Sequence, residues 1–126
     1  MIVDDHAVIR RMLRAVLEAE GFQVSDAMDG AEGVRKALEL KPDLIILDLS
    51  MPVMNGLEAA RELKVLMPHV PLLMFTNNAR EIQEKEALSA GILAVVQKSD
   101  SDSSKQLVAH ATVLLGAAGP ARFASD

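Results

Sequence analysis

Short apolar runs alternate with amphipathic stretches five times along the chain, and no other feature constrains the fold as strongly. The apolar runs are typical of buried strands, and they cover residues 1–3, 22–24, 44–47, 72–75 and 92–96. In the stretches between them, apolar side chains recur with the period of a helix that buries one face. This strict alternation predicts an α/β fold, in which a doubly wound, five-stranded parallel sheet carries helices on both faces.

Helix-stopping residues follow each amphipathic stretch. Helices are expected over residues 8–17, 31–40, 57–67, 82–88 and 107–115. The residues expected to end them are, in chain order, Gly21, Pro42, Pro68, Gly91 and Gly116. Glycine is common directly after a helix and proline cannot continue one, so these residues support the division into elements.

Composition narrows the class of protein. A length of 126 residues with 50% apolar side chains suits one domain. We expect this domain to span residues 1–116, with 117–126 as a disordered tail or linker stub. Cysteine is absent and no apolar run approaches the ~20 residues of a membrane span, which predicts a cytoplasmic protein. The net charge of −5 and the low aromatic content of 2% argue against direct nucleic-acid binding by this domain.

Four of the five predicted strands end at side chains with complementary chemistry. Asp4 and Asp5 follow the first strand, Asp48 the third, Thr76 the fourth and Lys98 the fifth. The carboxyl ends of parallel strands meet at one edge of the sheet, where ligands bind in doubly wound folds. Crowded carboxylates repel one another unless a cation joins them, and Mg²⁺ suits such oxygen ligands. Lysine and threonine opposite them suit the oxygens of a phosphoryl group, with an aspartate as nucleophile.

Each of these residues also has an ordinary interpretation. Asp4, Asp5 and Thr76 are good helix caps, Asp48 suits the cap of a turn, and Lys98 suits a solvated surface position. Chance would have to place complementary groups at four separate strand ends for all of these interpretations to hold together.

The motifs resemble the receiver domain of bacterial response regulators. The resemblance rests on Val3-Asp4-Asp5, on Asp48 with Met51-Pro52-x-Met54-Asn55-Gly56, on Thr76, and on Ala90-Gly91 ahead of Lys98. It covers nearly the whole chain, from about residue 1 to 115. It implies a flavodoxin-like (βα)5 fold with strand order 2-1-3-4-5.

The resemblance also implies a role for each site residue. Asp48 would accept a phosphoryl group from a sensor histidine kinase, a phosphotransfer protein or a small donor such as acetyl phosphate. Asp5, Asp48 and the carbonyl of Ser50 would ligate Mg²⁺ directly, and Asp4 would act through water. Lys98 and Thr76 would contact the phosphoryl oxygens, and water would later hydrolyse the acyl phosphate. Gly56 is expected to let the chain turn after Asp48.

Three positions depart from the family pattern. Val95 replaces the aromatic residue usual three positions before the lysine. The ring that moves inward in the family when the threonine engages phosphate is therefore missing. Asn77 follows Thr76 where a small residue is usual, and Ser99 follows Lys98 where proline is common in one subset. These departures keep open an alternative function, a degenerate receiver that acts as a phosphorylation-independent docking module.

Other functions fit less well. An aspartyl-phosphate phosphatase needs a second acid where Ser50 stands, and a flavin-binding module needs a phosphate-cradling loop where Asp4 and Asp5 stand. The three histidines are interpreted as solvated residues and not as metal ligands. The outer face of the last helix suits a partner or homodimer contact, although an ordinary exposed face explains it equally; it comprises Gln106, Ala109, His110 and Val113.

Overall fold

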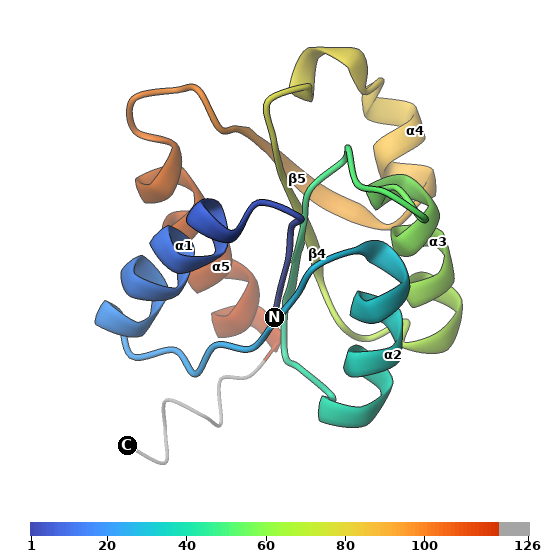
Figure 1. Cartoon of the computed structure of the whole chain (residues 1–126), viewed down its shortest axis with the longest axis horizontal. Helices are drawn as coiled ribbons and strands as arrows, with labels where there is room; N and C mark the ends of the chain where they lie inside the picture. Colours follow the sequence, from blue (N-terminus) through green and yellow to red (C-terminus); the bar gives the residue numbers. More distant parts are fainter. Residues whose placement is uncertain (119–126) are drawn as a thin grey trace.

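A computed structural model describes residues 1–118 and shows the predicted alternation of strands and helices (Figure 1). The elements in chain order are β1 (Ile2–Val3), α1 (Ala7–Ala19), β2 (Asp26–Ala27), α2 (Gly30–Leu40), β3 (Ile45–Leu47), α3 (Gly56–Leu66), β4 (Leu72–Thr76), the 3₁₀ turn η1 (Ala79–Glu81), α4 (Glu84–Ser89), β5 (Ile92–Gln97) and α5 (Ser103–Ala118). All neighbouring strands pair in parallel, in the order β2-β1-β3-β4-β5. The predicted flavodoxin-like topology is therefore confirmed.

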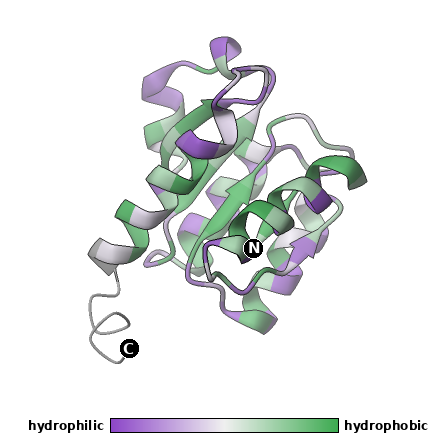
Figure 2. Cartoon of the chain, turned by 90° about the vertical axis from the view of Figure 1, so that its left-hand side faces the viewer, coloured by the Kyte–Doolittle hydropathy of each residue, from purple (hydrophilic) through white to green (hydrophobic). Residues whose placement is uncertain are grey.

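The sheet separates two layers of helices. Helices α1 and α5 cover one face, and α2, α3 and α4 cover the other (Figure 1). Successive strand residues point to opposite faces, so Leu73 and Phe75 join a buried cluster with Leu13 and Leu107, whereas Met74 packs on the other side. Apolar residues line the middle of the molecule in Figure 2. Each fully buried side chain of this size contributes about 2 kcal/mol.

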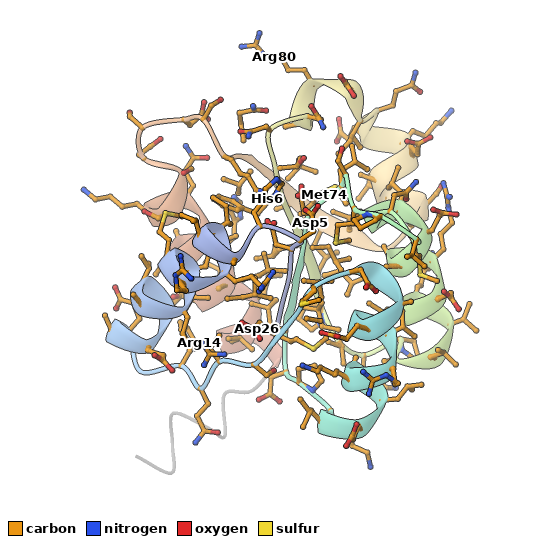
Figure 3. The ribbon with its side chains drawn as sticks, in the orientation of Figure 1. Asp5, His6, Arg14, Asp26, Met74 and Arg80 are labelled. Atoms are coloured by element: carbon orange, nitrogen blue, oxygen red, sulfur yellow. The ribbon has the colours of Figure 1, made fainter. Side chains whose placement is uncertain are left out.

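The second strand lies later in the chain than predicted. We expected residues 22–24, but β2 is Asp26–Ala27, which pairs with the two residues of β1. Contacts around Asp26 hold this register. Its carboxylate lies 3.6 Å from both Arg10 Nε and Arg14 Nη2 of α1, and its carbonyl accepts from Lys36 Nζ at 2.9 Å. Arg14 and Asp26 are labelled in Figure 3. The apolar residues of the 22–24 segment pack their side chains against the core without pairing.

Two helices also differ from the prediction. In place of one helix over 82–88, the chain forms η1, an extended Ile82, and the short helix α4. Gly91 does follow α4, with a φ of +88° that glycine adopts easily. Helix α5 continues past Gly116 to Ala118, because one glycine inside a helix costs only about 1 kcal/mol.

The rest of the predicted tail, residues 119–126, lies outside the described residues. Within the described part of the chain, no helix has both the length and the apolar character needed to cross a membrane.

Candidate functional site

The parallel strands bring four of the predicted site residues to one edge of the sheet. Asp4 and Asp5 follow β1, Asp48 follows β3, and Lys98 follows β5. Backbone pairing fixes these positions: Asp4 N donates to Ala27 O at 3.1 Å, and Asp48 N donates to Val3 O at 2.9 Å. The prediction that these residues converge is confirmed.

The centre of the site is a buried lysine between two buried carboxylates. Lys98 Nζ lies 2.7 Å from Asp4 Oδ2 and 3.1 Å from Asp48 Oδ2. The side chains of Asp4, Asp48 and Lys98 are 3%, 4% and 7% exposed, respectively. Water therefore screens these charges little, and the ammonium offsets the mutual repulsion of the carboxylates.

The two oxygens of Asp48 have different surroundings. Oδ1 accepts a hydrogen bond from Leu49 N at 2.8 Å, which orients the carboxylate, while Oδ2 faces Lys98. Asp4 is held in a similar way, because its Oδ1 accepts from the backbone N of His6 at 2.8 Å and its carbonyl accepts from Arg10 Nη1 at 2.7 Å. Within the described residues, every buried side-chain polar atom has a hydrogen-bond partner.

The loop between β3 and α3 depends on Gly56, but for a different reason from the one expected. Gly56 does not have a positive φ, so a turn conformation does not require glycine. Instead, an added Cβ would overlap the backbone carbonyl oxygen of Asp48. Gly56 N donates to Leu49 O at 2.8 Å, and a capping box between Asn55 and Glu58 begins α3 at this point. Helix α3 is thus packed directly under the loop that carries Asp48.

Asn78 links Thr76 and Ser50, a connection that sequence reasoning missed. Asn78 N donates to Thr76 Oγ1 at 3.1 Å, and Asn78 Nδ2 donates to Ser50 Oγ at 2.8 Å. The loop after β4 is therefore joined to the loop that follows Asp48. Thr76 is fully buried at the end of β4. Its hydroxyl is engaged by Asn78, and the contact with a phosphoryl group stays a prediction.

Gln97, the last residue of β5, holds the same loop from the other side. Its Oε1 accepts from Ala79 N at 3.1 Å, and its Nε2 donates to Asn77 O at 2.6 Å and to Ser99 Oγ at 3.0 Å. Two of the three departures from the family pattern, Asn77 and Ser99, thus take part in one polar network. The third, Val95, is half-buried and packs against the core.

Replacing Gln97 with leucine is expected to lower the free energy of unfolding by about 1–2 kcal/mol, because it leaves Ala79 N and Asn77 O without this partner. Urea denaturation measures the loss, and amide exchange should accelerate in residues 77–79. Gln106→Leu is the matched control, since it removes only a local bond from α5 to Asp102, the residue before that helix. Equal stability losses in the two variants would contradict the role given to the Gln97 network.

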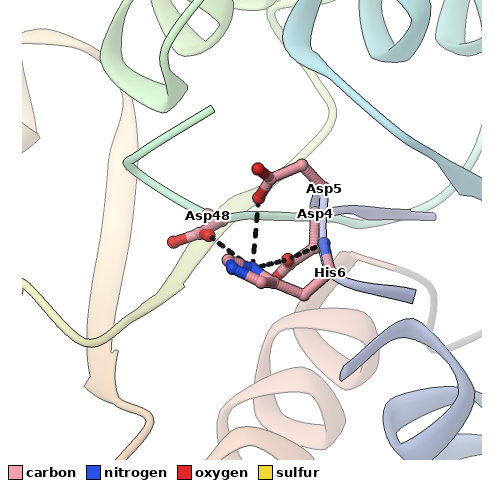
Figure 4. A group of neighbouring side chains, drawn as sticks. All are labelled: Asp4, Asp5, His6 and Asp48. Carbon is pink, nitrogen blue, oxygen red and sulfur yellow. Dashed lines mark hydrogen bonds and ion pairs between the residues drawn. The ribbon is translucent and has the colours of Figure 1, made fainter. Parts of the chain in front are cut away.

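His6 lies at the rim of the site. Its side chain is 61% exposed, as expected of a solvated residue, and Nδ1 lies 3.0 Å from Asp4 Oδ1, 3.1 Å from Asp5 Oδ1 and 3.9 Å from Asp48 Oδ2 (Figure 4). One ligand atom from each of these four residues lies within 4.8 Å of the others. Three carboxylates this close form a donor set that fits a hard divalent cation such as Mg²⁺.

The fold and the site together define a flavodoxin-like α/β protein with an acidic, lysine-bearing pocket at the carboxyl edge of its sheet. Residues 1–111 match the family described as the response regulator receiver domain. Chemotaxis protein CheY of Thermotoga maritima is 36% identical over 92 residues, which are 72% of this chain and 77% of that protein. The response regulator TrrA of the same organism, solved in complex with Mg²⁺–BeF, superposes with a TM-score of 0.81 at 28% identity, over 90% of this chain and 96% of that one.

A longer relative shares only this domain. A protein-glutamate methylesterase/protein-glutamine glutaminase of Caldanaerobacter subterraneus is 42% identical over 102 residues, which are 78% of this chain and 28% of that protein.

The chain belongs to the receiver domain family of two-component response regulators. This family consists of signalling phosphoacceptors that bind Mg²⁺ at an acidic pocket and interact with a histidine kinase or phosphotransfer partner. In this chain Asp4, Asp5 and Asp48 form an acidic cluster at the carboxyl edge of the sheet.

Proposed function

We propose that this domain is switched by Mg²⁺-dependent phosphorylation of Asp48. The observation that carries the proposal is the setting of the Asp48 carboxylate, which is buried, oriented through Oδ1 by Leu49 N, and directed through Oδ2 at Lys98 Nζ 3.1 Å away. A carboxylate fixed in this way meets the positional demand of phosphoryl transfer. The donor is a sensor histidine kinase, a phosphotransfer protein or a small acyl phosphate.

In the transfer step, a carboxylate oxygen of Asp48 attacks phosphorus and forms a P–O bond. The bond from phosphorus to the donor breaks, and its electron pair leaves with the donor imidazole or acetate. Negative charge gathers on the phosphoryl oxygens, where the Lys98 ammonium stabilises it. Thr76 Oγ1 donates to one of these oxygens. Water later attacks the acyl phosphate, releasing inorganic phosphate and restoring the Asp48 carboxylate.

The proposed metal ligands are Asp5, Asp48 and the backbone carbonyl of Ser50, with Asp4 acting through a water molecule. Mg²⁺, when bound, neutralises the carboxylates and draws electron density from a phosphoryl oxygen. The exposure of Asp5, whose side chain is 32% accessible, suits an ion that keeps several of its waters.

The output of the switch is a change in binding to a partner or an output domain. Thr76 Oγ1 accepts from Asn78 N and donates its own proton to the phosphoryl group, so phosphorylation is linked through this hydroxyl to the loop that Asn78 and Gln97 hold. The proposal places the receiver at residues 1–116 of a cytoplasmic protein. It includes homodimer formation as one output, and it includes no direct contact of this domain with nucleic acid or membrane.

A second candidate is a degenerate receiver that docks its partner without phosphate. Val95 favours it, because no aromatic ring is available to move when Thr76 engages a phosphoryl group. The two candidates differ in how the loop after β4 responds to a phosphoryl mimic.

Amide NMR spectra of the labelled protein with Mg²⁺, before and after addition of beryllium fluoride, separate these candidates. A phosphorylation switch predicts new shifts for Thr76, Lys98 and residues 77–79, all of which disappear in Asp48→Ala. A response to Mg²⁺ alone, with no further change on adding beryllium fluoride, would support the docking module and overturn the proposed switch.

A further inference from the structure

His6 lies beside the proposed metal ligands, and its ring nitrogen Nδ1 forms a hydrogen bond with Asp4 Oδ1 at 3.0 Å. It occupies the N-cap position of α1, but its side chain makes no capping hydrogen bond. In Figure 4 the imidazole points into the space between the carboxylates of Asp4, Asp5 and Asp48. The ring is therefore free of a helix-capping role and faces the metal pocket.

The distances around Nδ1 match those between donors on one ion. An octahedral ion with bonds of about 2.1 Å has neighbouring donors about 3.0 Å apart and opposite donors about 4.2 Å apart. The 3.1 Å separation from Nδ1 to Asp5 Oδ1, a proposed direct ligand, matches neighbouring positions, whereas the 3.0 Å contact with Asp4 Oδ1 is a hydrogen bond. The 3.9 Å separation from Asp48 Oδ2 lies between the two values. His6 is thus close enough to Asp5 to share an ion with it.

A nitrogen donor changes which metal a pocket favours. Carboxylate, carbonyl and water oxygens suit Mg²⁺, whereas imidazole suits Co²⁺, Ni²⁺ and Zn²⁺. We propose that His6 Nδ1 is a ligand in this pocket and shifts its selectivity from Mg²⁺ toward such transition-metal ions. This inference rests on the metal site of the proposed function. It adds His6 to the ligands of that site and transition-metal ions to the metals that the site binds.

Metal titrations on the full chain test the proposal. Isothermal titration calorimetry with Co²⁺ and with Mg²⁺ is compared for the wild type, His6→Ala, His6→Gln and the exposed-histidine control His110→Ala. We expect the Co²⁺ affinity of both His6 variants to fall about tenfold further than their Mg²⁺ affinity. His110→Ala should bind both ions as the wild type does. Equal changes for the two ions, or no change for Co²⁺, would overturn the proposal.

A spectroscopic readout separates ligation from simple hydrogen bonding. Pulsed electron paramagnetic resonance of bound Mn²⁺ should show coupling to nitrogen in the wild type and in His110→Ala, and none in His6→Ala. Nitrogen coupling that persists without His6 would overturn the proposal. The Asp48→Ala variant distinguishes a failure of the His6 proposal from a failure of the proposed metal site itself. If it weakens neither Mg²⁺ nor Co²⁺ binding, the metal site of the proposed function is wrong as well; if only the His6 tests fail, the proposed function stands.

Discussion

Replacing Gly56 with alanine is expected to lower the free energy of unfolding by about 3 kcal/mol, because the new Cβ meets only backbone atoms. It would overlap the carbonyl oxygen of Asp48 and lie 2.9 Å from the carbonyl carbon and 3.0 Å from Leu49 Cα. No side chain can rotate away to make room. Relief therefore requires moving α3 or the backbone of Asp48 itself, and the variant should lose metal binding along with stability.

Urea denaturation with Gly21→Ala as the control isolates this steric effect. Gly21 has a φ of +92°, but an added Cβ has open space around it. Its replacement should cost only the backbone strain of the left-handed region, about 1–2 kcal/mol. If Gly56→Ala were as stable as Gly21→Ala, with metal binding intact, the tight packing of α3 beneath Asp48 would be contradicted.

Replacing Lys98 with methionine is expected to destabilise the metal-free protein by about 3 kcal/mol. The substitution keeps most of the apolar stem but removes the ammonium that lies 2.7 Å from Asp4 and 3.1 Å from Asp48. Two nearly buried carboxylates are then left without their cation. Added Mg²⁺ should recover part of the loss, because an ion that binds only the folded state stabilises it.

A double-variant cycle checks the origin of this effect. Asp4→Asn introduced into Lys98→Met should recover at least half of the lost stability, because it removes one of the two repelling charges. The exposed Lys105 provides the control, and Lys105→Met should change stability by less than about 0.5 kcal/mol. No recovery in the double variant would show that Lys98 acts through packing and not through charge.

The order and type of the elements were predictable because local patterns determine them. Uniform apolar runs at 44–47, 72–75 and 92–96 are typical of strands in a covered sheet, and the observed strands β3, β4 and β5 coincide with them within one residue. The position of β2 was not predictable in the same way. Its register depends on the two residues of β1 and on arginines from α1 that hold Asp26, and both contacts are tertiary.

The site residues, too, were predictable where local sequence determines their position, and not where tertiary contacts do. The convergence of Asp4, Asp48 and Lys98 follows from strand direction alone, since each stands directly after a parallel strand. The roles of Asn78 and Gln97 depend on which loops meet at the sheet edge, and no motif in the sequence marks them. His6 carried a weak signal, its place next to Asp5, but the direction of its ring is set by the start of α1.

Intact-mass measurement after incubation with acetyl phosphate tests the central claim, phosphorylation of Asp48, most directly. We expect a single phosphoryl adduct on the wild type, formed only with Mg²⁺ present and absent from Asp48→Ala. A second control, Asp102→Ala, changes an exposed aspartate that is not part of the acidic cluster, and it should be phosphorylated as the wild type is. An adduct that persists in Asp48→Ala, or a wild type that binds Mg²⁺ yet forms no adduct, would contradict Mg²⁺-dependent phosphorylation of Asp48.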